Sequence, residues 1–201
     1  MNAPEKKPRL VRPDMEDTSK VNVTYEGETR AKFRTLIRST VDEVWHEITR
    51  TDRPIPAFFD SRLDAERMAP GAKIAMRTPD GKYTGFVGRI TEFDPPRRFA
   101  HTFRFTSYDE PEVVVAYDLE EVEGGVQFTM TLIDLVPGSK TAKQMANGAK
   151  FILGVLKSCM EDGRPKLGVR VLYKLFGLLA FMQPKRCLST NWPIEKSGVT
   201  P

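Results

Sequence analysis

Very few side chains in this sequence could carry acid–base or metal chemistry. It has two histidines, His46 and His101, and two cysteines, Cys159 and Cys187. No combination of His, Cys, Asp or Glu has the spacing of metal ligands, and no phosphate-binding loop or nucleophile motif is present. The sequence therefore predicts no metal site, no cofactor and no catalytic residues. Cys159 falls on the apolar face of a helical pattern, which is typical of a buried, inert thiol.

His101 is the histidine that strand alternation places on an inward sheet face. In residues 86–105, FVGRITEFDPPRRFAHTFRF, two alternating patterns flank a double proline, and His101 shares a face with Phe99 and Phe103. Neither proline can donate a ladder hydrogen bond, so the stretch predicts an antiparallel hairpin. His101 could anchor a ligand or act as a general base, but a core histidine bonded to a neighbour is the favoured interpretation.

Elements that would position this hairpin are predicted on both sides of it. A first strand at 31–38 is followed by the capping box Thr40-x-x-Glu43, which begins a short helix, and by a second short helix or turn near 56–60. Further strands are expected near residues 63–68, 72–78, 83–93, 98–106, 112–120 and 126–135. A long helix over 139–162 comes last, ended by Gly163. The order predicts an α+β fold, with a strongly curved antiparallel sheet of about six or seven strands wrapped around the long helix.

Charge divides the chain into three parts. Residues 1–20 carry five basic and four acidic groups and are expected to form a mobile tail. Residues 164–201 carry seven basic groups and one acidic group, which leaves a net charge of −3 on residues 21–163, the expected domain. A basic surplus outside the domain argues against nucleic-acid binding. No membrane span or secretory signal is found, so a cytoplasmic location is expected.

The C-terminal extension contains an amphipathic helix pattern over residues 166–182. Lys166, Arg170 and Lys174 are spaced four apart and are expected to form a basic stripe opposite a wide apolar arc that includes Leu167 and Val171. One interpretation is a helix that rests on an anionic membrane. The other is a helix that packs on protein, either on its own domain or on a second protomer in a homodimer. The width of the apolar arc favours burial against protein.

The order of elements resembles the helix-grip fold of the SRPBCC superfamily, which includes START and birch-pollen-allergen proteins. STVDEVW at 39–45, GFVGRITEFDPPRRF at 85–99 and TMT at 129–131, after a Gly-Gly turn, carry the likeness. They are most similar to the branch named after the activator of the heat-shock-90 chaperone ATPase. The resemblance spans roughly residues 30–163. Many relatives have a histidine where this chain has Leu132, and a tryptophan where it has Ala149; both differences make the expected cavity more apolar.

The resemblance implies a cavity between the sheet and the long helix, and alternation suggests its lining. The expected ligand-contacting residues are Tyr83, Phe99, His101, Phe103, Tyr117, Phe128, Met130, Met145 and Ala149. Such a lining suits a small hydrophobic or amphipathic ligand, such as a lipid, a sterol or a polyketide-like molecule. Two alternatives are a co-chaperone-like or membrane-surface module that uses the extension, and, less favoured, a cyclase- or hydrolase-type enzyme that uses His101 with a tyrosine.

Overall fold

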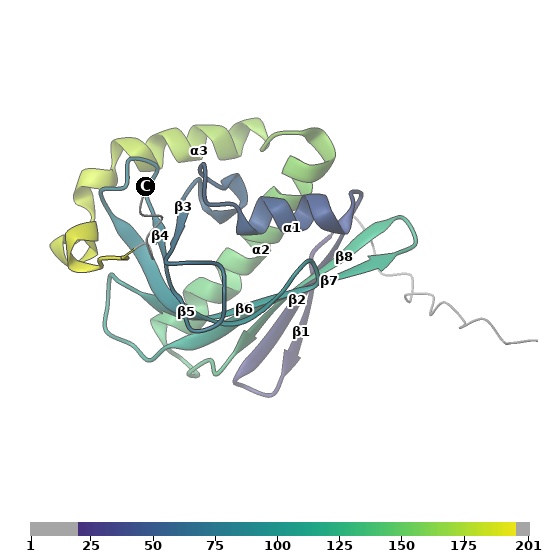
Figure 1. Cartoon of the computed structure of the whole chain (residues 1–201), viewed down its shortest axis with the longest axis horizontal. Helices are drawn as coiled ribbons and strands as arrows, with labels where there is room; N and C mark the ends of the chain where they lie inside the picture. Colours follow the sequence, from purple (N-terminus) through teal and green to yellow (C-terminus); the bar gives the residue numbers. More distant parts are fainter. Residues whose placement is uncertain (1–19, 196–201) are drawn as a thin grey trace, which may run out of the picture.

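An eight-stranded antiparallel sheet curves around one long helix (Figure 1). The computed structural model describes residues 20–195, so the expected tail lies outside the described residues except for Lys20. The strands are β1 (Asn22–Glu26), β2 (Arg30–Ile37), β3 (Arg62–Ala65), β4 (Lys73–Arg77), β5 (Thr84–Asp94), β6 (Arg98–Phe105), β7 (Val113–Val122) and β8 (Gly125–Ile133). Their order across the sheet is β1-β2-β8-β7-β6-β5-β4-β3, and every neighbouring pair is antiparallel.

The helices divide between the concave face of the sheet and the C-terminal extension. The α-helices are α1 (Val41–Thr49), α2 (Lys140–Asp162) and α3 (Leu167–Leu178), and the short 3₁₀ helices are η1 (Pro56–Phe58), η2 (Ala180–Met182), η3 (Lys185–Cys187) and η4 (Ser189–Asn191). Helix α2 crosses the sheet, while α3 runs along the upper edge of the molecule in Figure 1. This is the expected α+β helix-grip arrangement.

Local sequence signals begin and end the helices where they were predicted. Thr40 Oγ1 accepts from the Glu43 amide at 3.3 Å and Glu43 Oε2 accepts from the Thr40 amide at 3.2 Å, which completes the capping box of α1. Ser139 Oγ accepts from the Ala142 amide at 3.0 Å and begins α2. Gly163 ends α2 with a φ of 71°, a left-handed conformation that glycine adopts without strain.

One strand was missed, so the expected count of six or seven is corrected to eight. Strand β1 pairs only with β2, and its residues are half-buried or exposed. Its pairing comes from backbone hydrogen bonds at the sheet edge rather than from a buried face. Hydrophobic alternation therefore gives only a weak signal for such a strand.

The C-terminal extension does not bury the apolar arc of its helix. No residue of α3 is buried, although Tyr173 donates from its hydroxyl to the Pro56 carbonyl at 2.5 Å and meets the Phe151 ring edge-on. The favoured interpretation, burial of the whole arc against protein, is wrong as far as the chain's own domain is concerned. Helix α2 already occupies the concave face of the sheet, so α3 has only a narrow contact with the domain (Figure 1).

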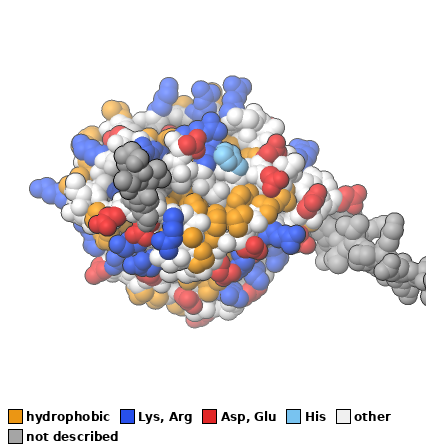
Figure 2. Space-filling view, in the orientation of Figure 1, with side chains coloured by type: hydrophobic (Ala, Val, Ile, Leu, Met, Phe, Trp, Pro, Cys, Tyr) orange, Lys and Arg blue, Asp and Glu red, His pale blue; other side chains and the backbone are white. Residues whose placement is uncertain are grey.

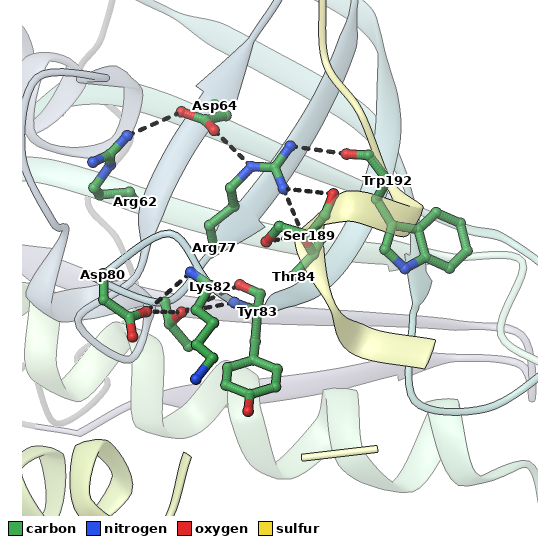
Figure 3. Close-up of polar contacts among 10 residues, drawn as sticks. Arg62, Asp64, Arg77, Asp80, Lys82, Tyr83, Thr84, Ser189 and Trp192 are labelled. Atoms are coloured by element: carbon green, nitrogen blue, oxygen red, sulfur yellow. Dashed lines mark hydrogen bonds and ion pairs between the residues drawn. The ribbon is translucent and has the colours of Figure 1, made fainter. Parts of the chain in front are cut away.

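Arg77, at the end of β4, ties the end of the described chain to the sheet (Figure 3). Its Nε donates to Asp64 Oδ2 at 2.6 Å, and its Nη1 donates to Thr84 Oγ1 at 2.9 Å. The same guanidinium donates to the carbonyls of Ser189, at 3.4 Å, and Trp192, at 2.8 Å. One buried cation thus joins β3, β4 and β5 to a segment more than a hundred residues away in the sequence.

Candidate ligand-binding cavity

An apolar cavity of about 290 Å³ lies between the concave face of the sheet and α2. Aromatic side chains of β5 and β6 form one wall, and Met145, Ala149 and Ile152 of α2 face them. Phe58 and Phe59, at the end of η1, close one side. Ala149 lines the cavity at the position where many relatives were expected to have a tryptophan. No residue of α3 lines the cavity, so the extension does not occupy the space of that side chain.

Seven of the nine residues predicted to contact a ligand come together in this wall: Phe99, His101, Phe103, Tyr117, Met130, Met145 and Ala149. Phe128 lies one layer deeper, fully buried, with its ring centroid 5.9 Å from that of Tyr117. Tyr83 precedes β5 and forms an isolated bridge with Leu188, so it faces a separate groove. The prediction for Tyr83 assumed that strand alternation continues unbroken to this residue. The pairing of β4 with β5 instead shifts register after Met76, so the assumption fails there.

Several residues of the wall were not predicted from the sequence, chiefly Phe58, Phe59 and Phe86. Phe86 belongs to the predicted β5–β6 hairpin, and its ring stacks on that of His101 with the centroids 5.5 Å apart. Phe86 pairs with Phe105 in the register of the hairpin, and this pairing was the signal that could have placed Phe86 in the cavity wall. Phe59 has a φ of 58° and stacks on Phe151 at 4.9 Å. No periodic pattern indicates such an orientation, because it depends on one left-handed residue.

Four polar side chains interrupt the apolar wall: Ser61, His101, Tyr117 and Gln144, of which Gln144 accepts from the Tyr108 hydroxyl at 2.9 Å. His101 Nδ1 lies 2.8 Å from the Thr102 carbonyl oxygen; a carbonyl can only accept, so Nδ1 carries the proton and Nε2 is an acceptor. The Tyr117 ring centroid is 5.9 Å from that of His101. Within residues 20–195, no protein group forms a hydrogen bond with His101 Nε2 or with the Tyr117 hydroxyl. One free acceptor and one free donor therefore line the cavity.

Burial keeps both of these groups neutral. Desolvation lowers the pKa of His101 to about 4, against the smaller opposing effect of its hydrogen bond to Thr102. Desolvation also raises the pKa of the Tyr117 hydroxyl far above its usual range. A neutral imidazole and a neutral phenol favour hydrogen bonding to a ligand over proton transfer at pH 7. Burial likewise raises the pKa of the Cys159 thiol to about 12, which disfavours a nucleophilic role.

A groove of about 600 Å³ adjoins the cavity on the side of α3. Tyr173, Phe176 and Gly177 of α3 form one of its walls. Phe59 and Ser61 line both spaces and stand between them. The inner side of α3 therefore forms one wall of a groove that adjoins the cavity. Among residues 20–195, no group of three or more His, Cys, Asp or Glu could hold a metal ion.

Residues 38–161 match the family model described as activator of Hsp90 ATPase homolog 1-like protein. The chain belongs to this family. The match runs from the loop after β2 almost to the end of α2, so it contains the whole cavity wall. Helix α3 and the rest of the extension lie outside it. No curated protein matches the chain.

Solved structures share the fold of this chain. A protein from Rhodobacter sphaeroides is 23% identical, with a TM-score of 0.55, over 71% of this chain and 99% of its own. DynU16, a putative protein in the dynemicin biosynthetic locus, is 25% identical over 68% of this chain and 49% of its own, with a TM-score of 0.56. An HSP90 activator from Plasmodium falciparum is 15% identical over 68% of this chain and 98% of its own, with a TM-score of 0.54.

Proposed function

We propose that this protein binds a compact apolar molecule that carries one hydroxyl group, in the cavity between the sheet and α2. The observation that carries the proposal is the pair of unpartnered polar atoms, His101 Nε2 and the Tyr117 hydroxyl, in a mostly apolar wall. Binding sites of this kind are mostly apolar, with a few polar groups that orient the ligand. A ligand that pairs with both atoms gains two hydrogen bonds, each worth about 0.5–1.5 kcal/mol.

The chemistry of the two atoms suggests how a ligand hydroxyl would bind. It can donate its proton to His101 Nε2 and accept one from the Tyr117 hydroxyl. The volume of about 290 Å³ lies at the lower limit of the roughly 300–1,000 Å³ of common ligand sites. It favours a phenol-like or short-chain alcohol over a full sterol among the ligand classes expected from the sequence. The position of DynU16 in a biosynthetic locus is compatible with a small-metabolite ligand.

Removal of the Tyr117 hydroxyl should weaken binding of a hydroxylated probe but not of its apolar analogue. We expect Tyr117→Phe to bind 1-naphthol about two- to tenfold more weakly, the worth of one hydrogen bond, and to bind 1-methylnaphthalene as the wild type does. Isothermal titration of the full chain with both probes measures the difference. Equal loss for both probes would mean that Tyr117 acts through packing alone.

Filling the cavity tests the location of binding independently. Ala149→Phe, on the cavity side of α2, should abolish binding of both probes, whereas Asn147→Phe, on the exposed side of the same helix, should not. Native mass spectrometry before and after organic extraction shows whether the purified protein already holds an apolar compound. Undiminished binding by a folded Ala149→Phe protein would refute a ligand site in this cavity.

The alternatives raised by the sequence remain predictions. Hsp90 activation is a property of the Plasmodium falciparum protein, and at 15% identity the likeness of the two chains is one of fold. In the enzyme alternative His101 would act as a general base; the Thr102 carbonyl orients its ring, but burial lowers the pKa of His101 to about 4, which disfavours proton transfer to it at pH 7.

A further inference from the structure

The outward side of the extension carries an unusually exposed apolar surface. Six large side chains form it, and we call them the outer apolar face: Leu167, Val171, Leu175, Leu178, Phe181 and Met182. Each is between 48% and 72% exposed. The first four recur at intervals of three and four residues, so they lie on one side of α3. Contiguous apolar surface of this kind on a folded domain marks an interaction site.

The outer apolar face is distinct from the side of α3 that holds the helix in place. Tyr173 bonds to Pro56 and contacts Phe151, and Val169 packs against the core. Tyr173 and Phe176 also line the groove beneath the helix. The domain therefore fixes α3 by one side and presents the other to the surroundings.

Basic residues predominate around this face, although the exposed Asp162 at the end of α2 shares a surface pocket with Lys166, Leu167 and Arg170. From Gly163 to Ile194 the chain has six basic residues and no acidic one: Arg164, Lys166, Arg170, Lys174, Lys185 and Arg186. All six side chains are exposed, and none forms an ion pair with another described residue. In the space-filling view, Lys and Arg side chains project from the upper edge, where α3 lies in Figure 1 (Figure 2).

We propose that the outer apolar face docks on an anionic membrane surface, with Lys166, Arg170 and Lys174 at the lipid headgroups. An exposed apolar stripe with basic neighbours is the pattern of a helix that lies in the membrane interface. A two-fold homodimer through α3 would instead bring two copies of the basic stripe Lys166, Arg170 and Lys174 together, a like-charge contact that Asp162 offsets only in part. No helix within residues 20–195 is long and apolar enough to span a bilayer, so the contact is with the surface.

Vesicle flotation of the full chain tests the proposal. We expect the wild type to float with vesicles of phosphatidylcholine and phosphatidylserine, weakly with phosphatidylcholine alone, and less as salt is raised. Lys166→Glu/Arg170→Glu/Lys174→Glu should lower partitioning on the order of a hundredfold, because each basic residue contributes separately at the surface. Val171→Asp/Leu178→Asp should do the same by interrupting the apolar face.

A matched triple variant controls for net charge. Arg34→Glu/Lys143→Glu/Lys150→Glu reverses three exposed basic residues outside the extension and should float like the wild type. Equal loss in this control, or no flotation of the wild type, would overturn the proposal. A stable dimer in sedimentation that Val171→Asp/Leu178→Asp dissociates would assign the face to a second protomer instead. The naphthol titration is made without vesicles, so failure of one proposal is distinguishable from failure of the other.

Discussion

Arg77→Met should lower the free energy of unfolding by about 3–5 kcal/mol, the largest loss that we expect from any single substitution discussed for this protein. The Arg77 side chain is 9% exposed and its guanidinium bonds Asp64, Thr84 and the carbonyls of two residues in the extension. Methionine fills the same space but leaves the Asp64 carboxylate without its nearest cation. Urea unfolding followed by circular dichroism measures the difference.

Arg62→Met is the matched control, because Arg62 pairs with the same carboxylate. Its contact with Asp64 is longer, 3.6 Å, and its side chain is 37% exposed. Exposed ion pairs contribute little, so we expect a loss of less than about 1 kcal/mol. Arg77→Met should also speed tryptic cleavage at exposed Arg186, since the segment around Ser189 loses its tie to β4. A small, equal effect of both substitutions would show that the tie is not important for stability.

Acidification should destabilise the protein through His101 by about 3 kcal/mol between pH 6.5 and pH 4. Burial lowers the pKa of His101 from 6.5 to about 4 in the folded chain. Between these values the unfolded chain binds a proton that the folded chain does not. The free energy of unfolding therefore falls as the pH drops through this window, and above pH 6.5 the contribution of His101 is constant.

A comparison of pH profiles isolates this contribution from the carboxylates that also titrate. His101→Leu should have a shallower decrease in the free energy of unfolding between pH 6.5 and pH 4 than the wild type. The exposed His46→Gln variant, which retains His101, should keep the wild-type profile. Parallel profiles for the wild type and His101→Leu would mean that the folded protein accommodates a protonated His101.

Local order was predictable from the sequence, because its physical causes lie between near neighbours. The capping box of α1 joins residues three apart, and the Gly163 stop acts on the turn beside it. Strand alternation likewise placed Phe99, His101 and Phe103 on one inward face. These signals indicated the helix-grip fold, and seven of the nine residues predicted to contact a ligand line the cavity.

Long-range contacts decided what the sequence did not. Phe128 alternates as its neighbours do, yet it lies behind Tyr117, because depth within a core depends on which layer covers a side chain. Arg77 looked like any strand arginine, and its partners at Ser189 and Trp192 are brought to it only by the folded extension. The residue type gives no sign of such partners.

Helix α3 shows the same division in one element. Helical spacing alone predicted an amphipathic helix within residues 166–182, and α3 forms there over Leu167–Leu178. Whether the arc is buried was decided by the tertiary structure, where α2 already fills the concave face and leaves α3 only a narrow contact (Figure 1). Periodicity tells which side of a helix is apolar, but burial requires a surface opposite it, and that surface is set by the packing of the rest of the chain.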